Sequence, residues 1–198
     1  RAVKSARKAF DEGPWPTMGR IERANCIHKL ADKMEEKVDE LAGYDATNMA
    51  KPLQQAKHDV ARSVQNFRFF ADHRRDHCGE AFPMDSGHHV YSEFGPAGVV
   101  AAISPWNFPL MMASWKIAPA IAWGNTCIIK PSEDTPASVT HLGRLAAEVG
   151  FPPGVLNVLN GHGAPAGASL TADWDVDRVT FTGSSMTGKM VMKSAAEH

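Results

Sequence analysis

Apolar positions spaced three and four residues apart mark the first eighty residues of the chain as helical. One such stripe runs from Ile27 to Ala42 and predicts a single long amphipathic helix. A second stripe runs from Leu53 to Ala71 and predicts another helix, whose periodicity is lost near Cys78 and Gly79. The pattern therefore predicts a helical part over residues 1–80.

The pattern then changes to one typical of strands. Residues 81–94 hold short apolar pieces around the turn composition Asp85-Ser-Gly87, which predicts a β-hairpin excursion. Beyond Gly95, four strand-like runs alternate with helical stretches, namely Val99–Ile103, Thr126–Ile129, Val155–Leu159 and Val176–Phe181. Such alternation predicts an α/β fold, with an open, parallel, Rossmann-like sheet flanked by helices over residues 95–198.

The connection after the second of these strands carries clear helix signals. Thr135 and Pro136 have the composition of a cap and first-turn pair, and Gly150 is typical of a helix end. Right-handed crossovers of this kind place the carboxyl ends of all the strands along one edge, where open α/β sheets bind ligands. Four motifs fall at that edge: Pro105 to Phe108, Lys130 to Glu133, Gly161 to Gly163, and Gly183 to Ser184.

Composition limits the classes of function. The chain has 198 residues, 43% of them hydrophobic, and a net charge of −1, which is typical of one or two globular domains with a real core. The charges are mixed along the sequence, so nucleic-acid binding lacks its basic surface. No apolar run is long enough to cross a membrane. We therefore expect neither nucleic acid nor membrane among its partners.

The cysteine and histidine positions argue against disulfides and metal. Three cysteines, Cys26, Cys78 and Cys127, are widely spaced and form no Cys-x-x-Cys pair, so we expect a reducing cytoplasm. His73 and His77 stand one helical turn apart, but the charged residues between them are typical of a solvated face, and no metal site is predicted.

Both ends of the sequence have the character of a fragment. The chain begins with the polar helix pattern Arg1-Ala-Val-Lys and has no initiator methionine. It finishes in a helical pattern, Val191 to His198, that has no capping residue. We expect further sequence on both sides.

Each motif at the sheet edge has a simpler interpretation beside the functional one. Asn107 stands between turn residues and could bond its own backbone, or it could present its amide to an oxyanion. Lys130 and Glu133 could be surface charges at a corner, or they could hold the phosphate and ribose ends of a nucleotide. The turn from Gly161 to Gly167 resembles a phosphate-binding turn, but its third glycine arrives one residue late.

Two other nucleotide-binding classes fail on particular residues. Gly183 to Lys189 fits a P-loop through its lysine, but Met190 has no oxygen for the magnesium ion of a nucleoside triphosphatase. A short-chain dehydrogenase needs a tyrosine four residues before a lysine, whereas Tyr44 and Tyr91 are followed at that offset by asparagine and glycine. What remains is a helix N-terminus behind Gly183, a site suited to a pyrophosphate.

A series of short motifs extends this picture across the whole chain. In order, they are Ser104-Pro-Trp-Asn-Phe-Pro109, Trp115-Lys116, Gly124-Asn125, Lys130-Pro-Ser-Glu133, Gly150-Phe-Pro-Pro-Gly-Val-Leu-Asn157 and Phe181-Thr-Gly-Ser184. Their order and spacing resemble those of the NAD(P)-dependent aldehyde dehydrogenase superfamily. The resemblance implies the N-terminal, cofactor-binding portion of an enzyme that oxidises an aldehyde to a carboxylic acid through a cysteine thioester.

The resemblance also implies roles for individual residues. It makes Asn107 the donor to the oxyanion and Lys116 a proton relay. Lys130 and Glu133 would hold the adenosine ribose, and the carboxylate would repel a 2'-phosphate, so NAD is expected over NADP. The remaining cofactor residues are Ile103, Pro105, Trp106, Ser132, Gly163, Gly183, Ser184 and Thr187. The aldehyde tunnel would be lined by Phe108, Met112 and Trp115.

The chain departs from the family pattern in informative ways. The catalytic cysteine and the general-base glutamate of the family belong to Gly-Gln-x-Cys and Glu-Leu-Gly-Gly segments, and neither segment occurs here. The chain alone is therefore expected to be inactive, and a non-catalytic NAD-binding piece is the alternative. The family's Asp-x-Gly-Lys-Pro signature is replaced by the longer Asp45-Ala-Thr-Asn-Met-Ala-Lys-Pro52, which lacks the glycine.

The resemblance further implies how the parts are arranged in the longer protein. Residues 1–80 and 95–198 would form the NAD-binding domain, and the hairpin 81–94 would belong to an oligomerisation domain of a homodimer or homotetramer. The catalytic domain would lie outside the chain. Ser63 to Ala71 and Met112 to Pro119 resemble the branches that act on hydroxymuconic semialdehydes and betaine aldehyde.

Overall fold

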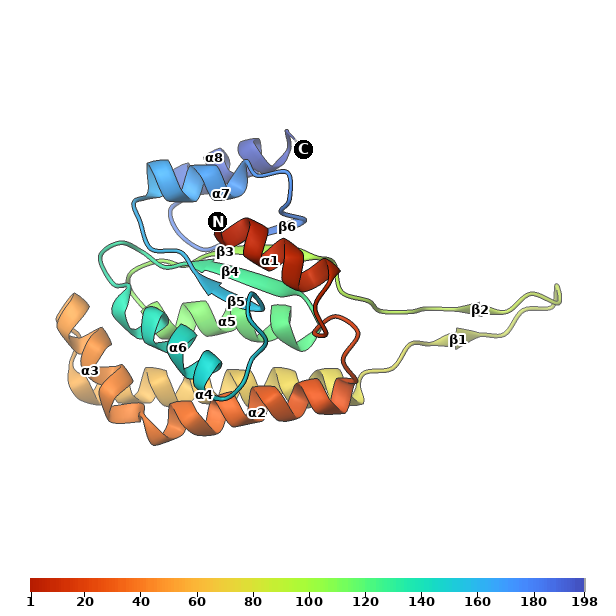
Figure 1. The fold of residues 1–198 in the computed structure, drawn as a ribbon, viewed down its shortest axis with the longest axis horizontal. Coiled ribbons are helices and arrows are strands. Elements are labelled where there is room, and N and C mark those ends of the chain that lie inside the picture. Colours follow the sequence, from red (N-terminus) through yellow and green to blue (C-terminus); the bar gives the residue numbers. More distant parts are fainter. Residues whose placement is uncertain (198) are drawn as a thin grey trace.

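A parallel four-stranded sheet forms the centre of the computed structural model, which describes residues 1–197 (Figure 1). The strands lie in the order β5-β4-β3-β6, with bounds Val99–Ile103 for β3, Thr126–Lys130 for β4, Leu156–Val158 for β5 and Arg178–Phe181 for β6. All neighbouring pairs are parallel. The predicted α/β class and Rossmann-like sheet are confirmed.

The last two strands begin later than their apolar runs predicted. The N–H of Val155 donates to the carbonyl of Pro152, and the N–H of Val176 donates to the carbonyl of Asp173. Both residues therefore still belong to turns when the apolar run has already begun, and the first residues paired in the sheet are Leu156 and Arg178.

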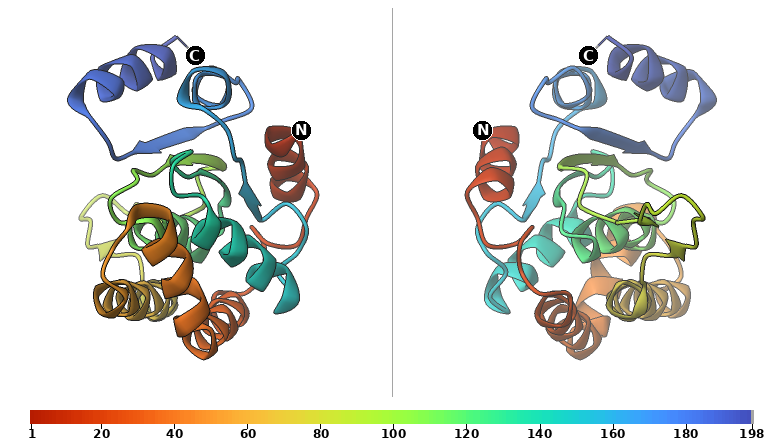
Figure 2. Two further views of the ribbon diagram at one scale, coloured as in Figure 1. Left: turned by 90° about the vertical axis from the view of Figure 1, so that its left-hand side faces the viewer. Right: turned by 90° about the vertical axis from the view of Figure 1, so that its right-hand side faces the viewer.

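Helices cover both faces of the sheet (Figures 1 and 2). On one face, α5 (Pro109–Ala122) and α6 (Ala137–Glu148) pack between the sheet and two long helices, α2 (Arg20–Glu36) and α4 (Leu53–Asp76). On the other face lie α1 (Ala2–Asp11) and the short α7 (Ala168–Thr171), with α8 (Ser185–Ala195) beside β6. Both faces of β3 and β4 are thus buried, which explains why these strands are continuously apolar instead of alternating.

The helical layer differs from its prediction at one point. The stripe from Ile27 to Ala42 is divided between α2 (Arg20–Glu36) and α3 (Val38–Met49), so the prediction of a single helix was wrong. At Lys37 the backbone N–H turns back to the carbonyl of Met34 and closes α2, and α3 begins in a new direction. The apolar spacing continues across this break, so periodicity could not reveal it.

The start of α6 was also predicted incorrectly. The helix begins at Ala137, with Pro136 rather than Thr135 at its N-cap position. The Thr135 hydroxyl has no hydrogen-bond partner among the described residues. Instead, the side-chain oxygen of Asn48, at the end of α3, accepts the N–H of Ala137 at 3.2 Å. A residue from another element therefore supplies the cap.

The turn between α3 and α4 (Leu53–Asp76) holds a left-handed residue at the place where the family signature has its glycine. Ala50 adopts φ 54° and ψ 33°. Among the described residues it is the only one other than glycine that has a positive φ. This conformation costs an L-residue roughly 1 kcal/mol that glycine avoids. We expect Ala50→Gly to raise the free energy of unfolding by about 1 kcal/mol in urea titrations. Ala46→Gly, inside α3, should lower it by a similar amount, and a loss in both variants would contradict the prediction.

A buried carboxyl group in α3 should make stability depend on pH. Asp45 is only 1% exposed, and burial raises its pKa above the ordinary 3.8, although Ser138 and the Leu110 backbone partly offset the effect. The fold therefore favours the protonated form, and the stability this group provides below pH 3.8 is lost as the pH rises. We expect Asp45→Asn to unfold at higher urea than the wild type at neutral pH, with the difference closing in acid. The exposed Asp39 of the same helix is the control position, where the asparagine variant should gain nothing.

Residues 81–94 form the predicted hairpin, which extends away from the body of the molecule (Figure 1). Its strands β1 (Ala81–Phe82) and β2 (Val90–Tyr91) are antiparallel, with Ala81 paired to Tyr91. Phe82, Met84 and Tyr91 are all about half exposed or more. In the described part of the chain, none of the helices has the length and apolar character needed to span a membrane.

Candidate functional site

Lys130 is the last residue of β4, and its side chain is buried although it is charged. Only 3% of the residue is exposed, so it is not a surface charge at a corner. Its Nζ donates to Oε2 of Glu133 at 3.1 Å and to the carbonyl of Pro131 at 2.9 Å. The ammonium is thereby fixed just outside the carboxyl end of the sheet.

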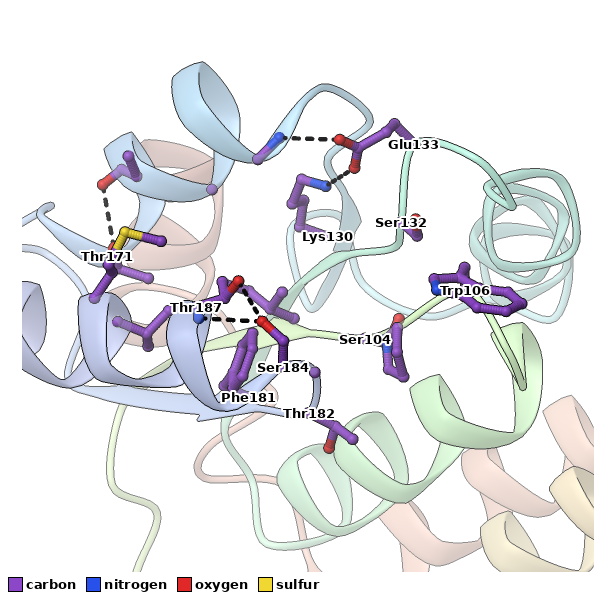
Figure 3. A pocket seen from close by; sticks show the side chains of 18 of the residues that line it. Ser104, Trp106, Lys130, Ser132, Glu133, Thr171, Phe181, Thr182, Ser184 and Thr187 are labelled. Carbon is purple, nitrogen blue, oxygen red and sulfur yellow. Dashed lines mark hydrogen bonds and ion pairs between the residues drawn. The ribbon is translucent and has the colours of Figure 1, made fainter.

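Glu133 is held as a carboxylate at the same place. Its own backbone N–H, the Lys130 ammonium and the N–H of Gly163 stabilise the charge and lower the pKa to about 2. The Gly163 N–H lies 3.4 Å from Oε1, so the carboxylate bridges the end of β4 and the turn after β5 (Figure 3). Glu133 therefore carries a full negative charge at every physiological pH.

The glycine-rich turn after β5 is a short π-helix rather than a standard phosphate-binding turn. The element η1 spans Gly163–Gly167 and runs directly into α7. A Cβ added to Gly163 would meet nothing within 4 Å, so this backbone faces open space. Gly167 packs instead on the Lys130 side chain, whose Cδ would lie 3.7 Å from an added Cβ. The turn leaves room for a ligand at Gly163 and supports Lys130 at Gly167.

The N-terminus of α8 faces the same space. Ser184 is the N-cap, and its hydroxyl accepts the N–H of Thr187 at 3.2 Å. An anion at such an end is stabilised by the helix dipole and the remaining free N–H groups. Gly183 has a local reason to be glycine, because a Cβ there would lie 2.5 Å from the Phe181 ring.

The loop between β3 and α5 presents two exposed side chains. Trp106 is 55% exposed, and Asn107 is exposed beside it. No hydrogen bond engages the Asn107 side chain within the described residues, so the interpretation that it only bonds its own backbone finds no support. The amide is available to a ligand.

These elements line one cavity of about 870 Å³ at the carboxyl edge of the sheet (Figure 3). It is large enough for a dinucleotide-sized ligand. Every residue predicted to bind the cofactor lies along it, together with Asn107: Ile103, Pro105, Trp106, Asn107, Lys130, Ser132, Glu133, Gly163, Gly183, Ser184 and Thr187. The predicted tunnel residues Phe108, Met112 and Trp115 do not line it, and their role stays a prediction.

The aldehyde dehydrogenase family model matches residues 1–198, the whole chain. The chain belongs to the aldehyde dehydrogenase family. It is 44% identical over 197 residues to aldehyde dehydrogenase family 2 member B4, mitochondrial, of Arabidopsis thaliana, a match that covers 99% of this chain and 37% of that protein. It is 41% identical over 199 residues to aldehyde dehydrogenase 1A1 of Homo sapiens, covering 100% of this chain and 40% of the human protein.

Solved structures of the family have the same fold. An NAD+ complex of an aldehyde dehydrogenase from Bacillus cereus superposes with a TM-score of 0.96 at 45% identity, over 99% of this chain and 40% of that one. A betaine aldehyde dehydrogenase variant from Staphylococcus aureus in complex with NAD+ gives 0.95 at 37% identity, over 100% and 40%. The chain thus spans about two fifths of the length of these relatives.

In this aldehyde dehydrogenase chain, Lys116 reaches the cavity indirectly. It is 8% exposed on α5, and its Nζ donates to the hydroxyl of Thr182, a cavity residue, at 2.5 Å. Burial lowers the pKa of Lys116. Its ammonium therefore loses a proton more readily than that of an exposed lysine, a property that a proton relay requires.

Two features of the site were missed in the sequence. Thr182 belongs to the Phe181-Thr-Gly-Ser184 motif, and its position at the end of β6 could have marked it. Lys51 belongs to the Asp45 to Pro52 segment compared above with the family signature, but nothing in that segment indicates which group Lys51 contacts. Its Nζ donates to the backbone carbonyl of Asn107 at 3.0 Å, across 56 residues of sequence.

Proposed function

We propose that this chain is the NAD-binding part of an enzyme that oxidises an aldehyde to a carboxylic acid with NAD, through a cysteine thioester. The Glu133 carboxylate carries the proposal. It is ionised, anchored by Lys130 and Gly163, and placed on the same cavity as the α8 N-terminus and the Asn107 amide. The similarity to structures solved as NAD+ complexes supports it.

The cavity offers matching groups to the parts of a dinucleotide. Glu133 and Lys130 supply an acceptor and a donor for ribose hydroxyls. The N-terminus of α8, behind Gly183, Ser184 and Thr187, suits a pyrophosphate. The remaining predicted cofactor residues, Ile103, Pro105, Trp106, Ser132 and Gly163, would form the walls. When bound, NAD supplies the acceptor for the hydride that leaves the substrate.

Charge at the ribose end favours NAD over NADP. A 2'-phosphate placed against Glu133 would bring two negative charges together. The neighbouring Lys130 ammonium already donates to that carboxylate and to the Pro131 carbonyl, so a single N–H donor remains for the ribose. The site therefore discriminates by repulsion rather than by a missing contact.

Asn107 would act in the chemical steps. Its unengaged amide, on a loop stiffened by Pro105 and Pro109, can donate to the oxyanion that forms when a thiolate attacks the aldehyde carbon. Lys116, whose Nζ donates to the cavity residue Thr182, would pass a proton. The aldehyde would enter along Phe108, Met112 and Trp115.

The nucleophile is assigned to a segment outside residues 1–198. None of the three cysteines lies on the cavity, and burial raises the pKa of Cys127 to about 12, which keeps that thiol protonated. The chain by itself is therefore proposed to be inactive. A purely NAD-binding, non-catalytic role is the second candidate, favoured by the same lack of a nucleophile on the cavity.

Several properties of the longer protein follow from the family. We propose that residues 1–80 and 95–198 belong to its NAD-binding domain and that the exposed apolar hairpin 81–94 contributes to subunit contacts in a homodimer or homotetramer. The three free cysteines fit a reducing compartment such as the cytoplasm. Betaine aldehyde and hydroxymuconic semialdehydes are the proposed substrate types.

Two measurements test the proposal separately. Calorimetric titration of the 198-residue chain with NAD should show saturable binding, and no heat at millimolar NAD would remove the cofactor-site assignment. The full-length protein, given NAD and a panel of aldehydes, should produce NADH absorbance, whereas the 198-residue chain should produce none. NAD binding without any NADH from the full-length protein would favour the non-catalytic alternative.

A further inference from the structure

Lys51 and Asp59 form a buried ion pair outside the cavity, at the junction of α3 and α4. The Lys51 Nζ lies 2.7 Å from Oδ2 of Asp59, and the two side chains are only 5% and 7% exposed. Removing two charges from water costs more than their attraction commonly returns, and an apolar pair in the same place is often as stable. Stability alone is therefore a weak reason for this pair.

The remaining contacts of Lys51 point to the loop that carries the oxyanion donor. Its Nζ donates to the backbone carbonyl of Asn107 at 3.0 Å and lies 4.0 Å from the centre of the Phe108 ring. With Asp59, these contacts occupy the donors of a single ammonium group. They fix the peptide after Asn107, and this peptide plane determines the direction in which the Asn107 side chain leaves the backbone.

Both residues of the Lys51–Asp59 pair are themselves held in place. Lys51 follows Ala50, whose left-handed conformation turns the chain sharply between α3 and α4. Asp59 lies in the second turn of α4, where its carbonyl accepts the Ser63 hydroxyl at 2.8 Å. The Asn107 side chain, by contrast, has no protein partner in the described structure, so its direction depends on its backbone.

We infer that the Lys51–Asp59 pair is a positioning device that holds the Asn107 loop in the geometry needed for oxyanion stabilisation. The inference rests on the proposed role of Asn107. Neither Lys51 nor Asp59 lines the cavity, so both would act through the Asn107 backbone and not on the substrate or cofactor. A displacement of about 1 Å in such a group can cost up to about a hundred-fold in rate.

The test replaces both members together, because one left alone would be an unpaired buried charge. In the full-length enzyme, Lys51→Met with Asp59→Asn should lower kcat roughly ten- to a hundred-fold and leave the Kd for NAD within about two-fold. Added to Asn107→Ala, the same pair of changes should cost no further kcat. The matched control is Lys57→Met with Asp39→Asn, an exposed pair 2.7 Å apart that is also anchored on α4, which should leave kcat unchanged.

Two outcomes of the kinetic test would overturn the inference. One is an unchanged kcat in the Lys51 and Asp59 variant. The other is an equal loss of kcat in the presence and absence of Asn107, which would mean that the pair acts on the fold in general.

A readout without catalysis keeps the inference separate from the proposed function. In the 198-residue chain, backbone ¹⁵N order parameters of Trp106, Asn107 and Phe108 should fall in the Lys51 and Asp59 variant, while those of β3 and β4 stay unchanged. This holds even if the full-length protein makes no NADH. Unaltered order in the loop, or a uniform loss throughout the chain, would refute the positioning role.

Discussion

Replacing Asn107 by alanine should lower kcat of the full-length enzyme by about 10²- to 10³-fold, with little change in the affinity for NAD. The size follows from the loss of one oxyanion donor, worth roughly 2.7 to 4 kcal/mol in the transition state. The amide makes no hydrogen bond within the described residues, so its removal leaves no polar partner unsatisfied. Steady-state kinetics with a saturating aldehyde, together with urea unfolding, measure the two consequences.

The unfolding midpoint is the internal control for this variant, because it should stay at the wild-type value. Asn25→Ala, at an exposed position of α2 far along the sequence from the cavity motifs, serves as the matched asparagine control and should keep full activity. A retained kcat in Asn107→Ala would show that the family resemblance misassigns the oxyanion donor, while leaving the cofactor site intact.

Replacing Glu133 by glutamine should weaken NAD binding roughly ten- to a hundred-fold. It should also reduce the ratio of NAD affinity to NADP affinity. The first effect is the loss of a charge-assisted hydrogen bond to a ribose hydroxyl, worth about 1.5 to 3 kcal/mol. The second effect is the removal of the charge that repels a 2'-phosphate. Titrations of the 198-residue chain with each dinucleotide measure both.

The pH dependence gives an independent check on Glu133. With the pKa lowered to about 2, this carboxylate stays ionised through the neutral and mildly acidic range, so it should add no pH dependence to NAD binding there. Asp134→Asn, which removes the adjacent exposed carboxylate, is the control and should keep the wild-type preference. If Glu133→Gln bound NADP no better relative to NAD than the wild type does, repulsion would not be the source of selectivity.

The convergence of the site on one sheet edge could be foreseen because it depends on local patterns and a general rule of topology. Apolar runs located β3, β4 and β6 to within about two residues, and parallel crossovers bring their carboxyl ends together. The motifs that follow those runs, at Pro105, Lys130 and Gly183, therefore had to lie close to one another. The cavity they line is the direct consequence.

The predictions that failed share a physical cause. The break at Lys37 lies within an unbroken apolar stripe, so it left no trace in periodicity. The cap of α6 comes from Asn48, 89 residues away, and not from the adjacent Thr135. Local sequence shows which adjacent polar group could cap a helix. It does not show which distant side chain forms that hydrogen bond in the folded protein.

The sequence by itself determined the α/β class, the family and part of the cavity lining, because periodicity and motif order are properties of short segments. Only the tertiary structure decided the state of those residues. Burial fixed Lys130 against Glu133, and the fold brought Lys51 to the Asn107 carbonyl across 56 positions. Ion pairs and hydrogen bonds depend on distances of a few ångströms, and such distances between remote segments exist only after the chain has packed.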